Sequence, residues 1–167
     1  MKEANEHFST HVDIYTDGSC LKNPGPGGYG AILIHGEKHK EISRGFQNTT
    51  NNRMELSGVI FALEELKYPC KVTIYTDSQY IAKAVNEGWL DKWQKNGWKT
   101  SSRNEVKNKD LWQEMIRLLN IHRVEFRWVK GHDGVHYNER CDEIARDAAR
   151  KASSLILNGK KLHSAYT

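Results

Sequence analysis

The chain has 167 residues, of which 38% are hydrophobic and 28% charged, a composition typical of one soluble globular domain. Its apolar runs are no longer than a single strand, far short of the roughly 20 residues that cross a bilayer, and the polar first ten residues carry no export signal. We therefore expect neither a membrane protein nor a secreted one. The three cysteines form no C-x-x-C pair and predict reduced thiols in a cytoplasmic protein.

The first part of the chain predicts a meander of strands, because apolar residues alternate there and glycines separate the runs. The predicted elements are a strand at His11–Asp17 that stops at Gly18, a turn-rich connection at 23–30, and strands at 29–35 and 40–46 joined by a turn around Gly36. Such a meander is an antiparallel unit.

Helices and strands alternate after the meander. The predicted elements are a helix from Asn51 or Asn52 to about Lys67, a strand at 71–77, a helix opened by Ser78 and running towards Glu87, a helix at 109–120, a strand at 123–129, a loop at 130–134 and a helix from about Tyr137 to Lys151. Residues 152–167 show no periodicity. With a helix in the segment 88–109, the order β-β-β-α-β-α-α-α-β-α predicts an α/β domain with a five-stranded mixed sheet flanked by helices.

The whole net charge of +4 lies in one segment. Residues 88–109 contain six basic and two acidic residues, together with three of the five tryptophans. A basic stretch interleaved with aromatic rings can hold phosphates and offer its rings to sugars or bases. A solvated helix with tryptophans in the core would give the same pattern, so charge alone leaves both interpretations open.

Two of the predicted strands end in the same way. Val12-Asp13-Ile14-Tyr15-Thr16-Asp17 is similar to Val72-Thr73-Ile74-Tyr75-Thr76-Asp77, so each strand delivers an aspartate at its carboxyl end. Ligands of open α/β sheets bind outside these ends, and the two aspartates converge there if the strands are parallel neighbours. Either one alone is also explained as a strand terminator or helix cap. Paired carboxylates repel unless a proton or cation lies between them, and a hard divalent cation is the natural partner.

Two further acids and a histidine are weaker candidates when taken singly. Glu55 lies in the first turn of a predicted helix, where the helix dipole favours any acid. Asp142 shares a helix face with Asn138 but also has acidic neighbours. His132 lies in a glycine-flanked loop, where an imidazole either transfers protons or faces solvent. Its spacing to His136 is interrupted by a glycine, which argues against zinc. The residue types alone do not select the metal ligands.

A series of motifs narrows the choice. These motifs are Thr16-Asp17-Gly18-Ser19-Cys20, Asn23 to Gly30, Thr49 to Leu56, Thr76 to Tyr80, Trp93 to Thr100, Val129 to His132, and Asn138 to Glu143. In this order and at these spacings they closely resemble the bacterial type 1 ribonuclease H family, over about residues 11–150. In that family the basic segment forms a protrusion called the handle.

The resemblance implies a ribonuclease H-like fold and an endonuclease that hydrolyses the RNA strand of RNA–DNA hybrids, leaving 5′-phosphate and 3′-hydroxyl ends. Asp17, Glu55, Asp77 and Asp142 match the family's four metal-binding carboxylates, which would hold two Mg²⁺ ions, with Mn²⁺ as a substitute. Two such ions stabilise the attacking and leaving oxygens of an in-line displacement. His132 matches the loop histidine that assists proton transfer or product release.

The resemblance also implies where the hybrid binds. Asn23, Asn51 and Gln79 match residues that meet the ribose hydroxyls, together with backbone near Cys20, and amides suit this task because they both donate and accept hydrogen bonds. Residues matched to the DNA strand are Trp93, the handle cations Lys95 and Lys99, and a phosphate pocket made by Thr50 and Asn108. Asn48 departs from the family pattern, because some relatives supply an arginine to that pocket.

Three expectations complete the prediction. The chain divides into a leader at 1–10, a catalytic domain at 11–151 with its handle at about 88–109, and a tail at 152–167. The protein is a cytoplasmic monomer whose partner is the RNA–DNA hybrid. Two rivals remain open: a hybrid-binding module without turnover, which needs no aligned acids, and a related nuclease of DNA junctions or ends, which would lack the handle and the Asn/Gln set.

Overall fold

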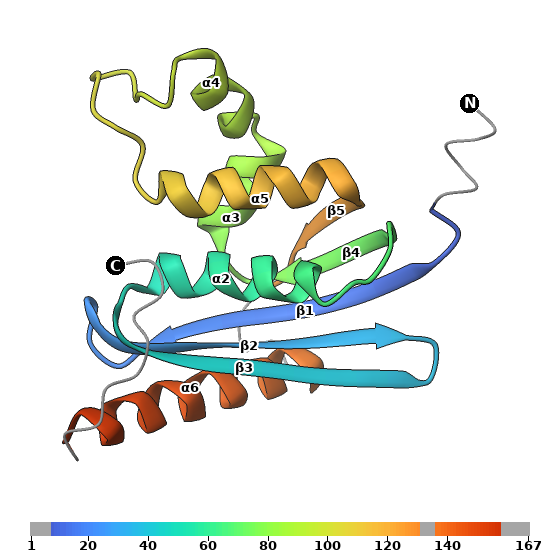
Figure 1. The fold of residues 1–167 in the computed structure, drawn as a ribbon, viewed down its shortest axis with the longest axis vertical. Coiled ribbons are helices and arrows are strands. Elements are labelled where there is room, and N and C mark those ends of the chain that lie inside the picture. Colours follow the sequence, from blue (N-terminus) through green and yellow to red (C-terminus); the bar gives the residue numbers. More distant parts are fainter. Residues whose placement is uncertain (1–7, 131–135, 158–167) are drawn as a thin grey trace.

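Five strands form one mixed sheet at the centre of the molecule (Figure 1). The structure is a computed structural model that describes residues 8–130 and 136–157. The strands are β1 (His11–Cys20), β2 (Gly25–His35), β3 (Lys38–Thr49), β4 (Lys71–Thr76) and β5 (Arg123–Trp128), in the spatial order β3-β2-β1-β4-β5. The first three strands pair antiparallel, whereas β4 is parallel to both β1 and β5. The predicted meander and parallel crossover are confirmed.

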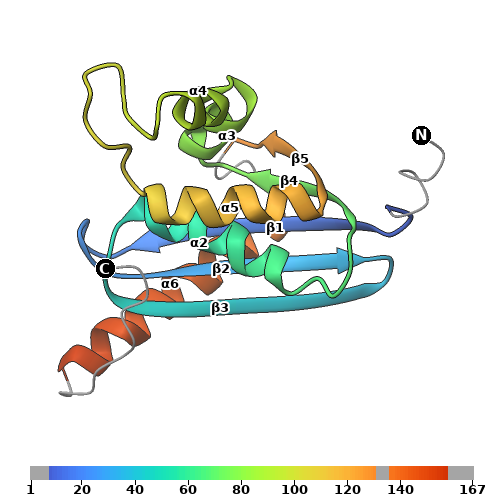
Figure 2. The same ribbon diagram turned by 45° about the horizontal axis from the view of Figure 1, so that its top comes forward.

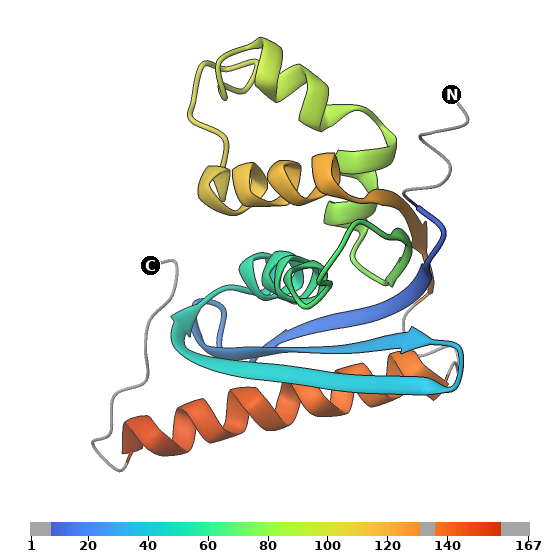
Figure 3. The same cartoon turned by 45° about the vertical axis from the view of Figure 1, so that its right-hand side comes forward.

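The helices cover the sheet from both sides, as Figures 1 and 3 show. They are α2 (Asn51–Glu64), α3 (Gln79–Asn86), α4 (Trp89–Lys95), α5 (Lys109–Ile121) and α6 (His136–Leu157). On one face α2 packs against β1 and β2, and α5 packs on α2. On the other face α6 crosses β1, β2 and β3. Within the described residues, no helix is both long and apolar enough to cross a membrane.

The main core lies between the sheet and the layer of α2 and α5. Ile14 and Ile74, which are paired in register across β1 and β4, are fully buried there with Trp112 of α5. Because side chains alternate along a strand, Tyr15, next to Ile14 on β1, faces α6 and packs against the cluster that contains Cys141 and Ile144. The basic segment follows α3, and its helix α4 stands at the far end of the molecule from α6 (Figure 2).

The glycine-rich run 23–30 is not the connection that the sequence predicts, because β2 already begins at Gly25 and β1 runs past Gly18 to Cys20. The glycines serve helix packing instead. A Cβ atom on Gly28 would lie 2.6 Å from Cβ of Ala148, and one on Gly30 would lie 2.7 Å from the carbonyl oxygen of Cys141. Glycine in a strand often marks such a close approach.

Three helix boundaries also differ from the prediction. The N-cap of α2 is Thr50 rather than an asparagine, because its Oγ1 accepts a hydrogen bond from the Arg53 amide at 3.2 Å. That helix ends at Glu64, where the following amides bond three residues back and tighten the last turn. The last helix, α6, continues six residues past its predicted end, to Leu157, with Ala152 fully buried. Ala152 is small and the two serines that follow it are polar, so this segment gives no clear apolar period.

Candidate active site

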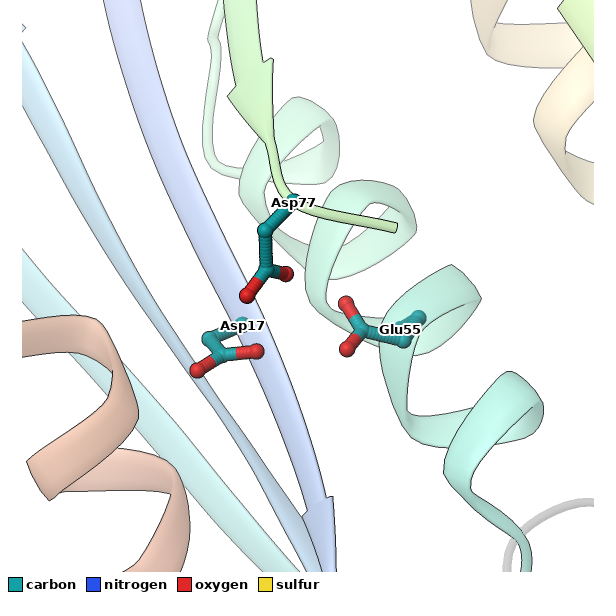
Figure 4. Close-up of side chains that lie close together, drawn as sticks. All are labelled: Asp17, Glu55 and Asp77. Atoms are coloured by element: carbon teal, nitrogen blue, oxygen red, sulfur yellow. The ribbon is translucent and has the colours of Figure 1, made fainter. Parts of the chain in front are cut away.

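Three carboxylates converge at the carboxyl ends of the parallel strands (Figure 4). Asp17 lies on β1, Asp77 directly follows β4, and Glu55 reaches the same point from α2. One oxygen from each lies within 4.8 Å of the other two. The structure therefore brings together three of the four acids of the predicted metal site, and it does so because β1 and β4 are parallel neighbours in register.

Gly18 allows Glu55 to approach. A Cβ atom at Gly18 would lie 2.6 Å from the Glu55 amide nitrogen and 2.7 Å from the carbonyl carbon of Met54, distances that real Cβ atoms do not tolerate. The glycine after Asp17 thus lets the first turn of α2 rest directly on β1. Its own amide donates a hydrogen bond to Oδ1 of Asp17 at 2.9 Å, which orients that carboxylate.

The electrostatics of the cluster favour a cation. Burial, and then the neighbouring charge of Asp77, raise the pKa of Asp17 to about 8. Burial and the charge of Asp17 raise the pKa of Glu55 well above its ordinary value. Oε2 of Glu55 is buried and makes no hydrogen bond within the described part of the chain. Buried like charges with an unpartnered oxygen suit a hard divalent cation that takes oxygen ligands.

The fourth predicted acid, Asp142, lines the same cleft from α6. Its Oδ2 forms an ion pair with Nη2 of Arg146, one turn further along the helix, at 2.9 Å. Asp142 is not part of the close group of three acids. One turn earlier on α6, both polar side-chain atoms of Asn138 are buried without a hydrogen bond among the described residues. His132, the predicted loop histidine, falls in 131–135 and lies outside the described residues.

Polar residues matched to the RNA strand surround the acids. The cleft has a volume of about 410 Å³, and Cys20, Asn51 and Gln79 line it beside the carboxylates. Asn23 lies next to it, because its Oδ1 accepts a hydrogen bond from the Asn51 amide at 3.2 Å. The Cys20 thiol donates to the Lys22 carbonyl at 2.9 Å, and burial raises its pKa. A protonated thiol held in this way shapes the loop rather than carrying charge.

Thr50 and Asn108, the predicted phosphate pocket, are joined by Arg53. The Arg53 amide donates to the Thr50 hydroxyl, and the Nη1 of the same residue donates to Oδ1 of Asn108 at 3.2 Å. Arg53 also forms a two-point ion pair with Asp110, at 3.1 and 2.7 Å, which lowers the pKa of that carboxyl. Neither Thr50 nor Asn108 lines the acidic cleft.

Tyr80 connects this pocket to the cleft, and the sequence prediction did not single it out. Its hydroxyl accepts hydrogen bonds from Nε1 of Trp112 at 2.8 Å and from Nδ2 of Asn108 at 3.3 Å, and the residue lines the acidic cleft. Its place directly after Gln79 in a recognised motif was the only available signal. The partners of Tyr80 lie 28 and 32 residues away in the chain.

The tryptophans of the handle form one aromatic cluster. Trp93 lies with its ring centroid 6.1 Å from that of Trp89, 6.4 Å from that of Trp98 and 5.5 Å from that of the buried Trp112. All three handle rings are partly buried and pack against the main core. Lys95 and Lys99 are exposed. The cluster thus attaches the handle to the body and leaves these two cations in solvent.

Comparison with known proteins gives consistent matches. Residues 9–150 match the family described as RNase H. Over 147 residues the chain is 56% identical to the Ribonuclease H of Idiomarina loihiensis, covering 88% of this chain and 93% of that one. It is 57% identical over 140 residues to the Ribonuclease H of Oleidesulfovibrio alaskensis, covering 84% and 91%. The crystal structure of LC9-RNase H1 is similar, with 34% identity, a TM-score of 0.77, and coverage of 86% of this chain and 74% of that one.

Proposed function

We propose, from the premise that this chain belongs to the RNase H family, that it is a hydrolase that cuts the RNA strand of RNA–DNA hybrids internally. One observation carries the proposal: the close group of Asp17, Glu55 and Asp77 at the carboxyl ends of β1 and β4. A binding module without turnover has no need of three acids held this close together, one of them buried, because their mutual repulsion opposes folding.

We infer that Asp17, Glu55, Asp77 and Asp142 hold divalent cations, with two Mg²⁺ ions as the expected cofactor and Mn²⁺ as a substitute. When bound, these ions would activate water and stabilise the leaving 3′-oxyanion, which gives 5′-phosphate and 3′-hydroxyl products. The protein contributes the fixed carboxylates, and Gly18 sets their spacing. Bare carboxylates would repel a phosphodiester, so cation binding also reverses the local field. We assign His132 to proton transfer or product release.

Selection of RNA over DNA falls to the amides around the cleft. Asn51 and Gln79 line it and Asn23 is hydrogen-bonded to Asn51, so all three are close enough to the acids to contact the strand that is cut. Their side chains can donate to and accept from a 2′-hydroxyl. Backbone near Cys20 completes this wall of the cleft.

We assign the DNA strand to the other side of α3. Trp93, Lys95 and Lys99 would contact it along the handle, while Thr50 and Asn108 would hold one of its phosphates. Oδ1 of Asn108 accepts a hydrogen bond from Arg53, and its Nδ2 donates one to Tyr80. Among the described residues this leaves its second amide proton for an anion. We also propose that the protein acts as a cytoplasmic monomer, with its catalytic domain at about 11–151.

The test is cleavage of an end-labelled RNA annealed to DNA, with Mg²⁺ and with EDTA, beside single-stranded RNA, double-stranded RNA, duplex DNA and a DNA junction. We expect cuts only in the hybrid, only in its RNA strand and only with the metal. Tight hybrid binding without cutting in Mg²⁺ or Mn²⁺ would support the binding-module rival. Preferential cutting of the DNA substrates would support the DNA nuclease.

A further inference from the structure

Trp128 is an exposed aromatic residue at the edge of the acidic cleft. It ends β5, and its indole Nε1 donates a hydrogen bond to the carbonyl oxygen of Asp77 at 3.2 Å. Nevertheless, 46% of the residue surface is exposed. The indole is therefore held in place beside a proposed metal ligand, and nearly half of its surface is open to a binding partner.

The ring lines a second hollow, which lies next to the acidic cleft. This hollow, the Trp128 groove, has a volume of about 390 Å³ and is lined by Gln79, Ala82, Lys83, Asn86, Glu87 and Trp128. Gln79 lines both the groove and the acidic cleft, so the two hollows adjoin at this residue in the first turn of α3. A nucleic-acid strand that crosses the acids and contacts Gln79 would therefore reach the groove next.

The chemistry of the groove suits a nucleotide. An indole contacts sugars and bases of any sequence, and the exposed ammonium of Lys83 is a point charge suited to a phosphate. Glu87, one helical turn beyond Lys83, repels a phosphate and limits the favourable part of the groove to the end near Gln79. Asn86 adds a donor and an acceptor of hydrogen bonds.

We propose that the Trp128 groove binds a nucleotide of the RNA strand beyond the scissile phosphate, with the indole against its sugar or base and Lys83 at its phosphate. The assignment to the RNA strand rests on the proposed function, because Gln79 belongs there to the set that contacts the strand being cut. The groove is then a subsite that favours hybrids long enough to reach it.

The experiment uses hybrids that share one mapped cleavage position. Their RNA strand is shortened stepwise from the 5′ or the 3′ end while the DNA strand keeps its length, and a second series shortens only the DNA. Wild type, Trp128→Ala, Trp128→Phe and Lys83→Ala are compared by KM, kcat and the hybrid Kd in EDTA. The control is Tyr68→Ala, which removes another exposed aromatic ring, 57% exposed, from a site away from the cleft.

On full-length RNA we expect Trp128→Ala to raise KM and Kd by roughly 5- to 50-fold, Trp128→Phe to raise them less, and Tyr68→Ala to leave them unchanged. The ratio of the variant KM or Kd to the wild-type value should fall towards one in one of the two RNA series, the one that removes the nucleotide bound in the groove. It should stay high in the series that shortens the RNA from the opposite end. A ratio that is constant at every RNA length would overturn the proposal and leave the indole as a support for Asp77. A ratio that follows the DNA length would also overturn it.

The Kd comparison separates this inference from the proposed function. The Kd measurement needs no turnover. A wild-type protein that cut no hybrid would refute the proposed hydrolase activity. The dependence of Kd on RNA length would still test whether the Trp128 groove binds the RNA strand.

Discussion

At the scale of single residues, Asp17 combines a proposed metal-binding position with a cost to folding. Its carboxyl is buried next to Asp77, and its pKa is raised to about 8. At neutral pH, the folded chain without metal therefore favours the protonated carboxyl. Below pH 4 this acid is neutral both folded and unfolded and carries no penalty. As the pH rises towards 8, the unfolded chain ionises freely and the folded chain does not. Without metal, this group therefore makes the protein less stable with rising pH.

We predict that Asp17→Asn abolishes hybrid cleavage and stabilises the metal-free protein. In EDTA at pH 8 the free energy of unfolding should rise by at least about 1 kcal/mol, or roughly 2–4 °C in Tm for a chain of this length. The gain should shrink towards pH 4. Thermal unfolding with and without Mg²⁺ checks this, because Mg²⁺ should raise the Tm of the wild type more than that of the variant. Equal Mg²⁺ shifts, with normal cleavage, would remove Asp17 from the metal site.

Tyr80 shows how a residue of the cleft also carries stability. Trp112 is fully buried, and its Nε1 donates to the Tyr80 hydroxyl. Tyr80→Phe leaves this donor without its acceptor, which should cost about 1–3 kcal/mol. Urea unfolding measures the loss, with Tyr68→Phe as a control that removes an exposed hydroxyl. An unchanged midpoint in Tyr80→Phe would mean that Trp112 finds another acceptor.

The sequence predicted some site residues much better than others. The three close acids could be predicted because two of them end similar strands and all lie in motifs that the family shares. The link from Arg53 through Asn108 and Tyr80 could not, because each is an ordinary polar residue whose partner lies far along the chain. Such contacts depend on how α2, α3 and α5 pack, and no local pattern encodes that packing.

At the scale of elements, we expect opposite effects from alanine substitutions at two glycines near Asp17. A side chain at Gly18 would collide with the backbone of α2, whereas a Cβ at Gly58 meets only ordinary contacts, at 3.4 Å or more. Gly18→Ala should therefore displace the turn that carries Glu55, lower the Tm and reduce kcat by at least tenfold. Gly58→Ala should keep the activity and stabilise the helix by up to about 1 kcal/mol, since alanine is the better helix former.

Measured kcat and Tm of the two variants decide this point. A Gly18→Ala protein with wild-type turnover would show that α2 can shift without moving Glu55, and it would remove the close packing from the explanation of the site. A Gly58→Ala protein as damaged as Gly18→Ala would mean that the whole interface between β1 and α2, rather than the turn at Glu55, is intolerant of added volume.

The glycines also explain where element prediction failed. Turn-rich composition correctly marks Gly36, whose φ is 60°, but the same composition at 25–30 belongs to a strand under α6. The distinction depends on Ala148 and Cys141, more than 100 residues later, which are invisible to a local pattern. Likewise, Ala152, Ser153 and Ser154 open the last turns of α6 with small or polar residues, so no apolar periodicity predicted that the helix continues. Long apolar helices and alternating strands were predicted well because their burial repeats at a fixed period.

At the scale of the whole molecule, the basic segment is separated from the acidic cluster. The acids lie at the carboxyl ends of β1 and β4, whereas the basic segment stands on the side of α4, beyond α3 (Figure 1). The aromatic packing of Trp93 on Trp112 attaches the basic segment to the body of the protein, which carries the acids. Under the proposed function, the cations would hold a long hybrid while one phosphate of its RNA strand meets the acids.

This separation predicts a specific dependence on salt. Lys95→Ala with Lys99→Ala should raise KM several-fold at 150–200 mM salt with little change in kcat, because binding to phosphates releases counterions. The slope of log Kd against log salt should fall by about one for each phosphate contact removed, so by about two. The matched control is Lys38→Ala with Lys71→Ala, two exposed lysines on strand ends away from the acids. If the control pair changes the slope as much as the handle pair, the protein binds hybrid through its overall charge, and the handle has no special share in holding the DNA strand.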